Sequence, residues 1–142
     1  GVASSNGKAW IHSVGRTKDV SKLWDYVEDQ DGFLESMAEA SSGVLNYFGK
    51  DNMAFINVAN KISIDCDCDS NPKDPEMADI GIFASLDPVS LDKCCYDTIM
   101  NSSDPHRHSL IERMEEKHAI HIVEIAEELG IGTTDYEIIN ID

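Results

Sequence analysis

The chain has 142 residues, enough for one domain with its own hydrophobic core, and its formal net charge at pH 7 is −16. This charge argues against nucleic acid and against an anionic membrane as partners, because both are bound through clustered Lys and Arg side chains. No apolar run reaches membrane-spanning length, the first residues lack a signal-peptide pattern, and the four cysteines form two tight pairs instead of a dispersed disulfide framework. We therefore expect a cytoplasmic protein with reduced thiols, whose acidity serves solubility or attracts a cation or a basic partner.

Residues 1–15 are rich in Gly, Ser and Asn, and they include Gly7-Lys8 and His12-Ser13. Small residues beside a lysine can cradle an anion, although the complete phosphate-loop pattern is absent. The segment opens on Gly-Val-Ala-Ser-Ser without a methionine. We therefore expect the chain to be the C-terminal fragment of a longer protein.

The spacing of apolar residues predicts the elements that follow. In chain order we expect helices over residues 17–28 and 33–49, a strand over 53–64, a loop over 65–77, a strand over 79–86, helices over 87–101 and 108–129, and a strand over 136–141. Helices that alternate with apolar strands predict a single α/β domain over residues 1–142. Its sheet should be small, mixed and mostly buried, with about three or four strands packed by about four helices.

The most distinctive stretch is the strand that runs into Asp65-Cys66-Asp67-Cys68-Asp69. Side chains alternate along a strand, so the aspartates should point one way and a buried stripe should deliver both thiols to the other face. That stripe would consist of Ile56, Val58, Ile62, Ile64, Cys66 and Cys68.

Two thiols on one face form half of a site for zinc or iron, and the remaining ligands would come from elsewhere. The candidates are His12, Asp65, Asp67, His106 and His108. Carboxylates beside Cys66 and Cys68 should raise the thiol pKa, which argues against a free nucleophile. The alternative is that both cysteines simply continue the apolar core.

Asp87 and Asp92 follow the second predicted strand, and ligands of open α/β sheets collect beyond the carboxyl ends of strands. With Gly7 and Lys8, these aspartates are our candidate cofactor-binding residues. Asp87 is equally explained as the cap of a helix that has Pro88 in its first turn. We find no nucleophilic triad and no paired-carboxylate site, so no catalytic residue is assigned.

Several of these motifs resemble a known family. They comprise residues 55–58 leading to 65–68, residues 79–92 (Asp-Ile-Gly-Ile-Phe-Ala-Ser-Leu-Asp-Pro-Val-Ser-Leu-Asp), Leu129-Gly130-Ile131-Gly132, Asp135-Tyr136-Glu137, and the opening Gly7-Lys8 with His12-Ser13. The family is an uncharacterised prokaryotic one, whose members are often called Fe–S centre proteins and are grouped as domain of unknown function 362. The resemblance covers nearly the whole chain.

The resemblance implies that a long N-terminal half precedes this part in relatives. That missing half is the expected partner, with a homo-oligomer as the alternative. Many relatives also carry a ferredoxin-like module directly after the His-Ser motif, where this chain has residues 17–32 without a cysteine. We therefore expect no iron–sulfur cluster in this fragment.

Three functions follow as hypotheses. The first is metal binding through Cys66 and Cys68, helped by His12 and an aspartate. The second is an enzyme whose substrate site is completed by the missing half. It predicts that seven residues converge in one cleft, namely Gly7, Lys8, His12, Cys66, Cys68, Asp87 and Asp92. The third is a structural or interaction domain in which the cysteines belong to the core.

Overall fold

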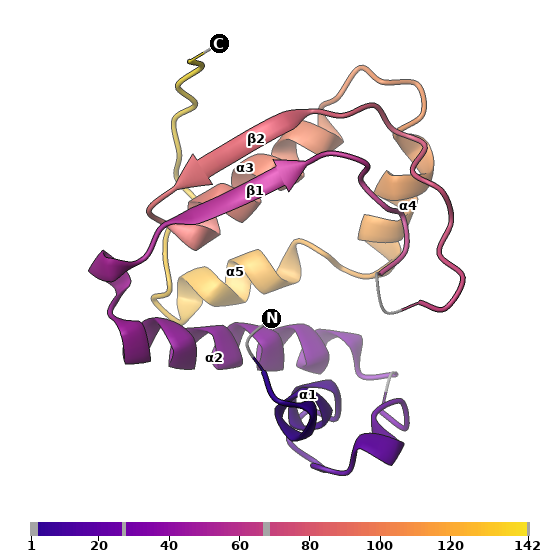
Figure 1. The fold of residues 1–142 in the computed structure, drawn as a ribbon, viewed down its shortest axis with the longest axis vertical. Helices are drawn as coiled ribbons and strands as arrows, with labels where there is room; N and C mark the ends of the chain where they lie inside the picture. Colours follow the sequence, from indigo (N-terminus) through magenta and orange to yellow (C-terminus); the bar gives the residue numbers. More distant parts are fainter. Residues whose placement is uncertain (1–2, 27, 67–68, 142) are drawn as a thin grey trace.

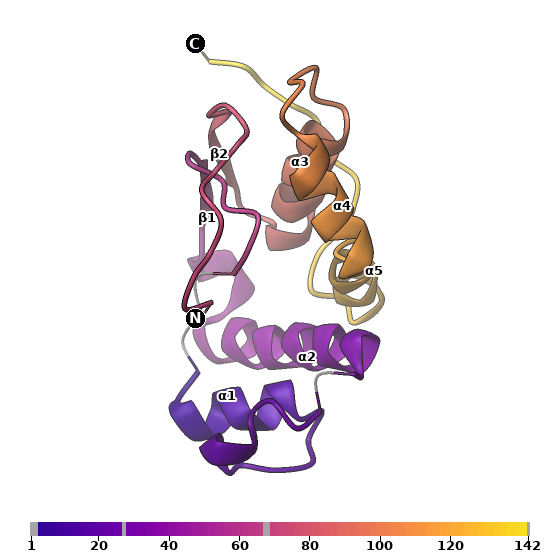
Figure 2. The same ribbon diagram turned by 90° about the vertical axis from the view of Figure 1, so that its right-hand side faces the viewer.

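The computed structural model describes residues 3–26, 28–66 and 69–141 as a two-stranded sheet with helices on one side of it (Figures 1 and 2). In chain order the elements are α1 (Ser5–His12), η1 (Val20–Lys22, a 3-10 turn), α2 (Gln30–Phe48), η2 (Lys50–Asn52, a 3-10 turn), β1 (Phe55–Ala59), β2 (Gly81–Ser85), α3 (Pro88–Met100), α4 (His108–Glu116) and α5 (His121–Glu128). The prediction of an α/β fold is confirmed. The sheet differs from it: the described residues contain two strands, and these are antiparallel.

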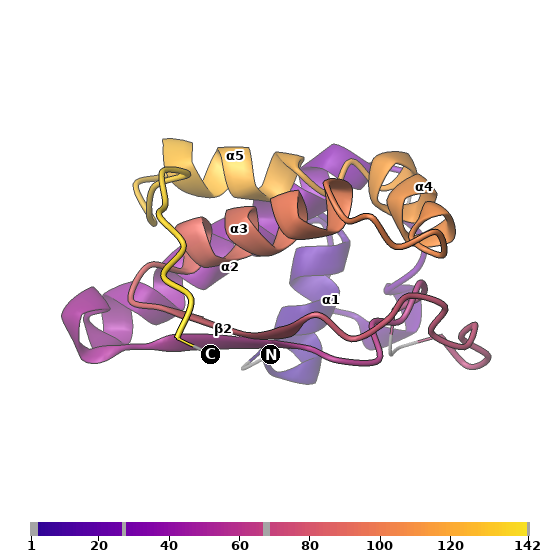
Figure 3. The ribbon, with the colours of Figure 1, turned by 90° about the horizontal axis from the view of Figure 1, so that it is seen from above.

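The helices form layers against one face of the sheet. Figure 3 shows α3 above the paired strands, with α5 and α2 beyond it, while α1 packs on the far side of α2 (Figure 2). The main core lies between these layers. Its buried residues are Ala38 and Leu45 of α2, Val89 of α3, Val123 of α5, and Ile131 after α5. No helix in the described ranges combines the length and the apolar composition needed to cross a bilayer.

The buried face of β1 is the opposite of the one predicted. Phe55, Asn57 and Ala59 are half-buried, whereas Ile56 and Val58 are 66% and 63% exposed. Alternation correctly separates the two sets, but it does not say which set meets the helices. Asn57 belongs to the inward set together with Phe55 and Ala59, and its side-chain amide bonds to Asp92 of α3, as described below. The outer face of the sheet is therefore apolar and exposed, and β2 adds Ile82 to it.

Two further predicted strand segments are wrong. The first strand stops at Ala59 instead of residue 64, because Lys61 takes a left-handed conformation (φ 47°) and donates its backbone N–H to Asp79. Residues 136–141 belong to no strand, and the hydroxyl of Tyr136 donates to Asp97 of α3 instead.

The helices follow their local signals where these are strong. Asp29 caps α2 by accepting from the N–H of Gly32, and Gly49 ends that helix at φ 82°. Asp87 caps α3 with Pro88 in the first turn, as expected. The prediction fails at the N-terminus. The helix there is α1, capped by Ser4, whereas residues 17–26 contain a single 3-10 turn.

The long helix predicted over residues 108–129 is two helices. His118 adopts φ 48° after α4, and the N–H groups of His118 and Ala119 bond to the carbonyls of Glu115 and Met114. This is a Schellman-type ending, which glycine usually provides. A histidine in the left-handed region is uncommon, so the sequence carried no clear signal for the break.

Candidate functional site

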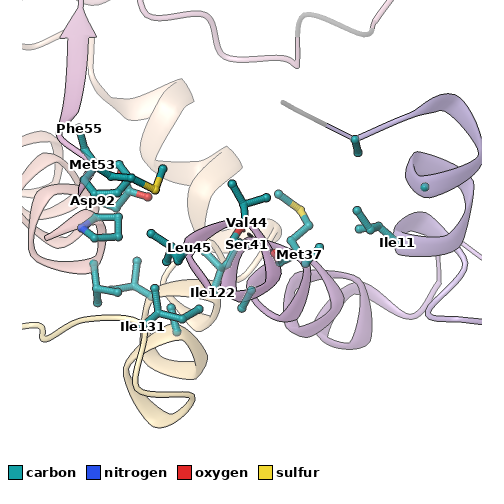
Figure 4. A pocket seen from close by; sticks show the side chains of 18 of the residues that line it. Ile11, Met37, Ser41, Val44, Leu45, Met53, Phe55, Asp92, Ile122 and Ile131 are labelled. Atoms are coloured by element: carbon teal, nitrogen blue, oxygen red, sulfur yellow. Dashed lines mark hydrogen bonds between the residues drawn. The ribbon is translucent and has the colours of Figure 1, made fainter. Parts of the chain in front are cut away.

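A cavity of about 670 Å³ opens between α1, α2, β1, α3 and α5. Figure 4 shows Met53, Phe55 and Asp92 at one end, Leu45 and Ile122 near the middle, and Ile11 toward α1. The lining residues are Ala3, Gly7, Trp10, Ile11, Met37, Ala38, Ala40, Ser41, Val44, Leu45, Met53, Phe55, Pro88, Val89, Asp92, Ile122, Val123, Ala126 and Ile131.

Small side chains explain why these elements leave a hollow. The wall from α2 is a stripe at helical spacing, and it includes Ala38, Ala40 and Ser41. Helix α5 adds Ala126 to the lining, and α1 adds Gly7. The space is open to solvent, and a concave site of this size with mostly apolar walls is suited to holding a small molecule.

Asp92 is the one charged residue among the described residues that line the cavity. Its Oδ1 accepts a hydrogen bond of 2.8 Å from the side-chain amide of Asn57 on β1. The same amide nitrogen lies 3.5 Å from the Sγ of Cys95, one turn further along α3. Asn57 therefore ties the sheet to α3 and fixes the position of the Asp92 carboxylate.

The thiol of Cys95 is poorly suited to nucleophilic chemistry. Burial is the main cause that raises its pKa, and the negative charge of Asp92 acts in the same direction, although the hydrogen bond from Asn57 opposes both. Because the thiolate is the reactive form, Cys95 stays protonated and unreactive at neutral pH. The polar end of the cavity is thus a carboxylate held in place, with no activated thiol beside it.

The candidate residues of α1 divide between two places. Gly7 lines the cavity, while Lys8 is exposed and is not part of the lining. The ring of His12 packs against Phe33 at a centroid distance of 4.6 Å and against Trp24 at 5.4 Å. Burial, followed by the charge of Lys8, lowers the pKa of His12. His12 thus occupies an aromatic cluster between α1, α2 and residue 24.

Asp87 is engaged in holding the fold. Its Oδ1 accepts from the N–H groups of Val89 and Ser90, and its Oδ2 accepts from the N–H of Thr133. The ammonium of Lys50 lies 3.8 Å from the same carboxylate. Asp87 and Asp92 are therefore separated in role, since Asp92 lines the cavity and Asp87 joins three segments.

The structure describes half of the Asp-Cys-Asp-Cys stretch. Asp65 accepts a 2.7 Å hydrogen bond from Arg113 of α4 and a 3.2 Å bond from the backbone of Lys73. The bond from Lys73 is the main cause that lowers the pKa of Asp65. Cys66 is exposed, whereas Asp67 and Cys68 lie outside the described residues. Among the parts of the chain that are described, no three His, Cys, Asp or Glu side chains could hold a metal ion together.

The model of a protein family called domain of unknown function, DUF362, matches residues 1–97. The chain belongs to the DUF362 family. The resemblance noted from the motifs is confirmed over residues 1–97. The match does not reach the motifs at residues 129–137, and the Fe–S centre name and the missing ferredoxin-like module stay predictions. No curated protein and no solved structure matches the chain. Within DUF362, the matched residues supply α1, α2, the sheet and most of α3, and with them Gly7, Asn57 and Asp92.

Sequence reasoning found Asp92 and Gly7 but missed the rest of the cavity. Asn57 sits among apolar residues of β1, and no motif marks it as part of a site. A polar side chain at that position was the available signal, since an inward amide needs a hydrogen-bond partner. The cavity is formed by five elements that are distant in sequence, so no local sequence pattern predicts it.

Proposed function

We propose that this DUF362 chain is a ligand-binding domain, which takes up a small molecule with an apolar body in the cavity between α1, α2, β1, α3 and α5. The observation that carries the proposal is the cavity itself, with its apolar walls and one fixed carboxylate. Its volume of about 670 Å³ falls in the range of small-molecule sites, which are mostly apolar and have a few placed polar groups.

A neutral probe such as Nile red tests this proposal. The protein should bind the dye at one saturable site, and Ala126→Phe should abolish binding by filling the cavity, because Ala126 forms part of the α5 wall. Ala84→Phe makes the same change on the exposed outer face of β2, and it should leave binding intact.

The exposed face of the sheet is the competing site for an apolar dye. Ile82 is 73% exposed there, so Ile82→Lys would remove binding at that face without touching the cavity. Dye binding that responds to Ile82→Lys and ignores Ala126→Phe would overturn the proposal. Circular dichroism of each variant establishes that the fold is retained.

A metal ion at the loop of residues 65–68 is the second candidate function. Cys66 is exposed directly after Asp65, and the sequence places a second thiol and a second carboxylate next to them. Zinc and iron both accept thiolate and carboxylate ligands. The ion pair between Asp65 and Arg113 is an argument against this candidate, because Asp65 would have to give up the Arg113 guanidinium in order to bind a metal ion. Metal content after anaerobic purification, compared between the wild type and Cys66→Ser with Cys68→Ser, decides this candidate.

The enzymatic hypothesis gains no support from the geometry. It required the candidate residues to converge, and of those that the structure describes, Gly7 and Asp92 line the cavity while the others do not. The others are Lys8, His12, Cys66 and Asp87, while Cys68 lies outside the described residues. A missing N-terminal half, self-association and a cytoplasmic location stay proposals from the sequence.

A further inference from the structure

We propose that the ligand of this cavity is a cationic amphiphile, an apolar chain or ring system with one amine or quaternary ammonium group that pairs with Asp92. The inference rests on the proposed function, because it names the class of molecule that the same cavity would take. It follows from three observations: the charge of the lining residues, the hydrogen bond that holds Asp92, and the contacts that nearby lysines make.

The Asp92 carboxylate has a free oxygen for a ligand. Asn57 occupies Oδ1, and no described residue donates a hydrogen bond to Oδ2 or forms an ion pair with Asp92. A ligand cation at Oδ2 would therefore displace no existing partner. Because Asn57 already orients the carboxylate, little side-chain freedom is lost when the cation binds.

Two lysines near α3 already pair with carboxylates. Lys93 of α3 pairs with Asp97 one turn along the helix, and Lys50 pairs with Asp87. At the Asp92 end of the cavity, an anionic head group such as a carboxylate or a phosphate would meet Asp92 and no basic side chain of the described lining. The net charge of −16 would repel it further on approach.

The cavity also has an orientation. At its α1 end, the ammonium of Lys18 lies over the ring of Trp10, 5.0 Å from the centroid, and Trp10 belongs to the lining. A ligand cation placed there would be repelled by Lys18. The charged group is therefore assigned to the Asp92 end, and the apolar body extends past Leu45 and Ile122 toward Ile11 (Figure 4).

Three probes with the same alkyl chain test the assignment: dodecylammonium, dodecanol and dodecanoate, each titrated calorimetrically below the concentration at which it forms micelles. All three share the apolar contribution, so differences report the head group. At physiological salt we expect dodecylammonium to bind about threefold tighter than dodecanol, the scale of an exposed ion pair, and dodecanoate to bind weakest. The preference should grow as salt is lowered.

Asp92→Asn removes the charge but keeps an oxygen that can accept from Asn57. It should abolish the difference between dodecylammonium and dodecanol. The matched control is Glu112→Gln, which removes one negative charge from an exposed position of α4 outside the cavity. Each variant removes one negative charge, so each weakens the general attraction of the acidic protein for a cation equally. Glu112→Gln should nevertheless keep the preference for dodecylammonium over dodecanol, because Asp92 is intact.

The outcomes separate this inference from the proposed function. Saturable binding of dodecanol with no advantage for dodecylammonium, or tighter binding of dodecanoate, would overturn the charge assignment and leave the cavity as a ligand site. An equal loss in Asp92→Asn and Glu112→Gln would also overturn it. If none of the three probes binds, both proposals are wrong.

Discussion

Replacing Gly132 with alanine would place a methyl group where the carboxylate of Asp87 now lies. The backbone of Gly132 is outside the left-handed region, so alanine brings no conformational strain of its own. The cost arises because Asp87 must move. In doing so it would lose its cap bonds to α3 and its bond from Thr133.

The magnitude can be worked from these bonds. Loss of a helix cap costs about 1 kcal/mol, and loss of the bond from Thr133 costs about another 1 kcal/mol. Alanine also reduces the freedom of the unfolded chain, which returns about 0.5 kcal/mol. We expect Gly132→Ala to lower the free energy of unfolding by about 1.5 kcal/mol and the melting temperature by about 5 °C.

Urea unfolding followed by circular dichroism measures this change. Gly43→Ala is the matched control, because a methyl group at Gly43 in α2 meets no atom within 4 Å. It should stabilise the protein by about 0.5–1 kcal/mol, since alanine favours the interior of a helix. In an Asp87→Ala background the penalty of Gly132→Ala should vanish. A Gly132→Ala protein as stable as the wild type, or an equal penalty in both backgrounds, would refute the reasoning.

Three further predictions concern single side chains. The hydrogen bond to Asp97 raises the pKa of Tyr136 to about 12, so its contribution to stability is complete below pH 10 and is lost as the pH rises through about 12. Ultraviolet titration should show a tyrosine ionisation near pH 12 that Tyr136→Phe removes. Cys66 is exposed and Cys94 is buried, so a thiol reagent should modify Cys66 in the folded protein and Cys94 only after unfolding. If Cys66→Ser left the fast labelling of the folded protein unchanged, this prediction would be contradicted. Leu45→Ala should lower the free energy of unfolding, measured in urea, by about 2–3 kcal/mol. This is low for a buried leucine, because one side of Leu45 already borders the cavity. A change near zero would contradict its place in the core.

Elements with strong local signals could be predicted from the sequence. Helix α3 follows from Asp87-Pro88, and the end of α2 follows from Gly49, because caps depend on neighbouring residues alone. The break between α4 and α5 could not be predicted, since His118 takes a conformation that glycine normally signals.

The orientation of the sheet and the candidate site depend on contacts between distant residues. Alternation in β1 leaves two choices, and the inward face is the one that carries Asn57, which bonds to Asp92 35 positions away. Asp92 could be selected from its place after an apolar strand, but its Asn57 partner and the hollow beside it could not. The metal half-site was read from Cys66 and Cys68, and the second of these lies outside the described residues.

The C-terminal segment determines how far the chain can be truncated without losing its core. The family match ends at residue 97, which is inside α3. Residues after position 97 are needed to complete the core formed by residues 1–97. Helix α5 packs on α2 and α3, Ile131 enters the core, and Thr133 bonds to Asp87. A chain shortened to the matched residues would expose Leu45 and Val89 and would lose one wall of the cavity. Tyr136 also donates a hydrogen bond to Asp97 of α3, so the shortest piece worth expressing extends through Tyr136, well past residue 97 where the family match ends.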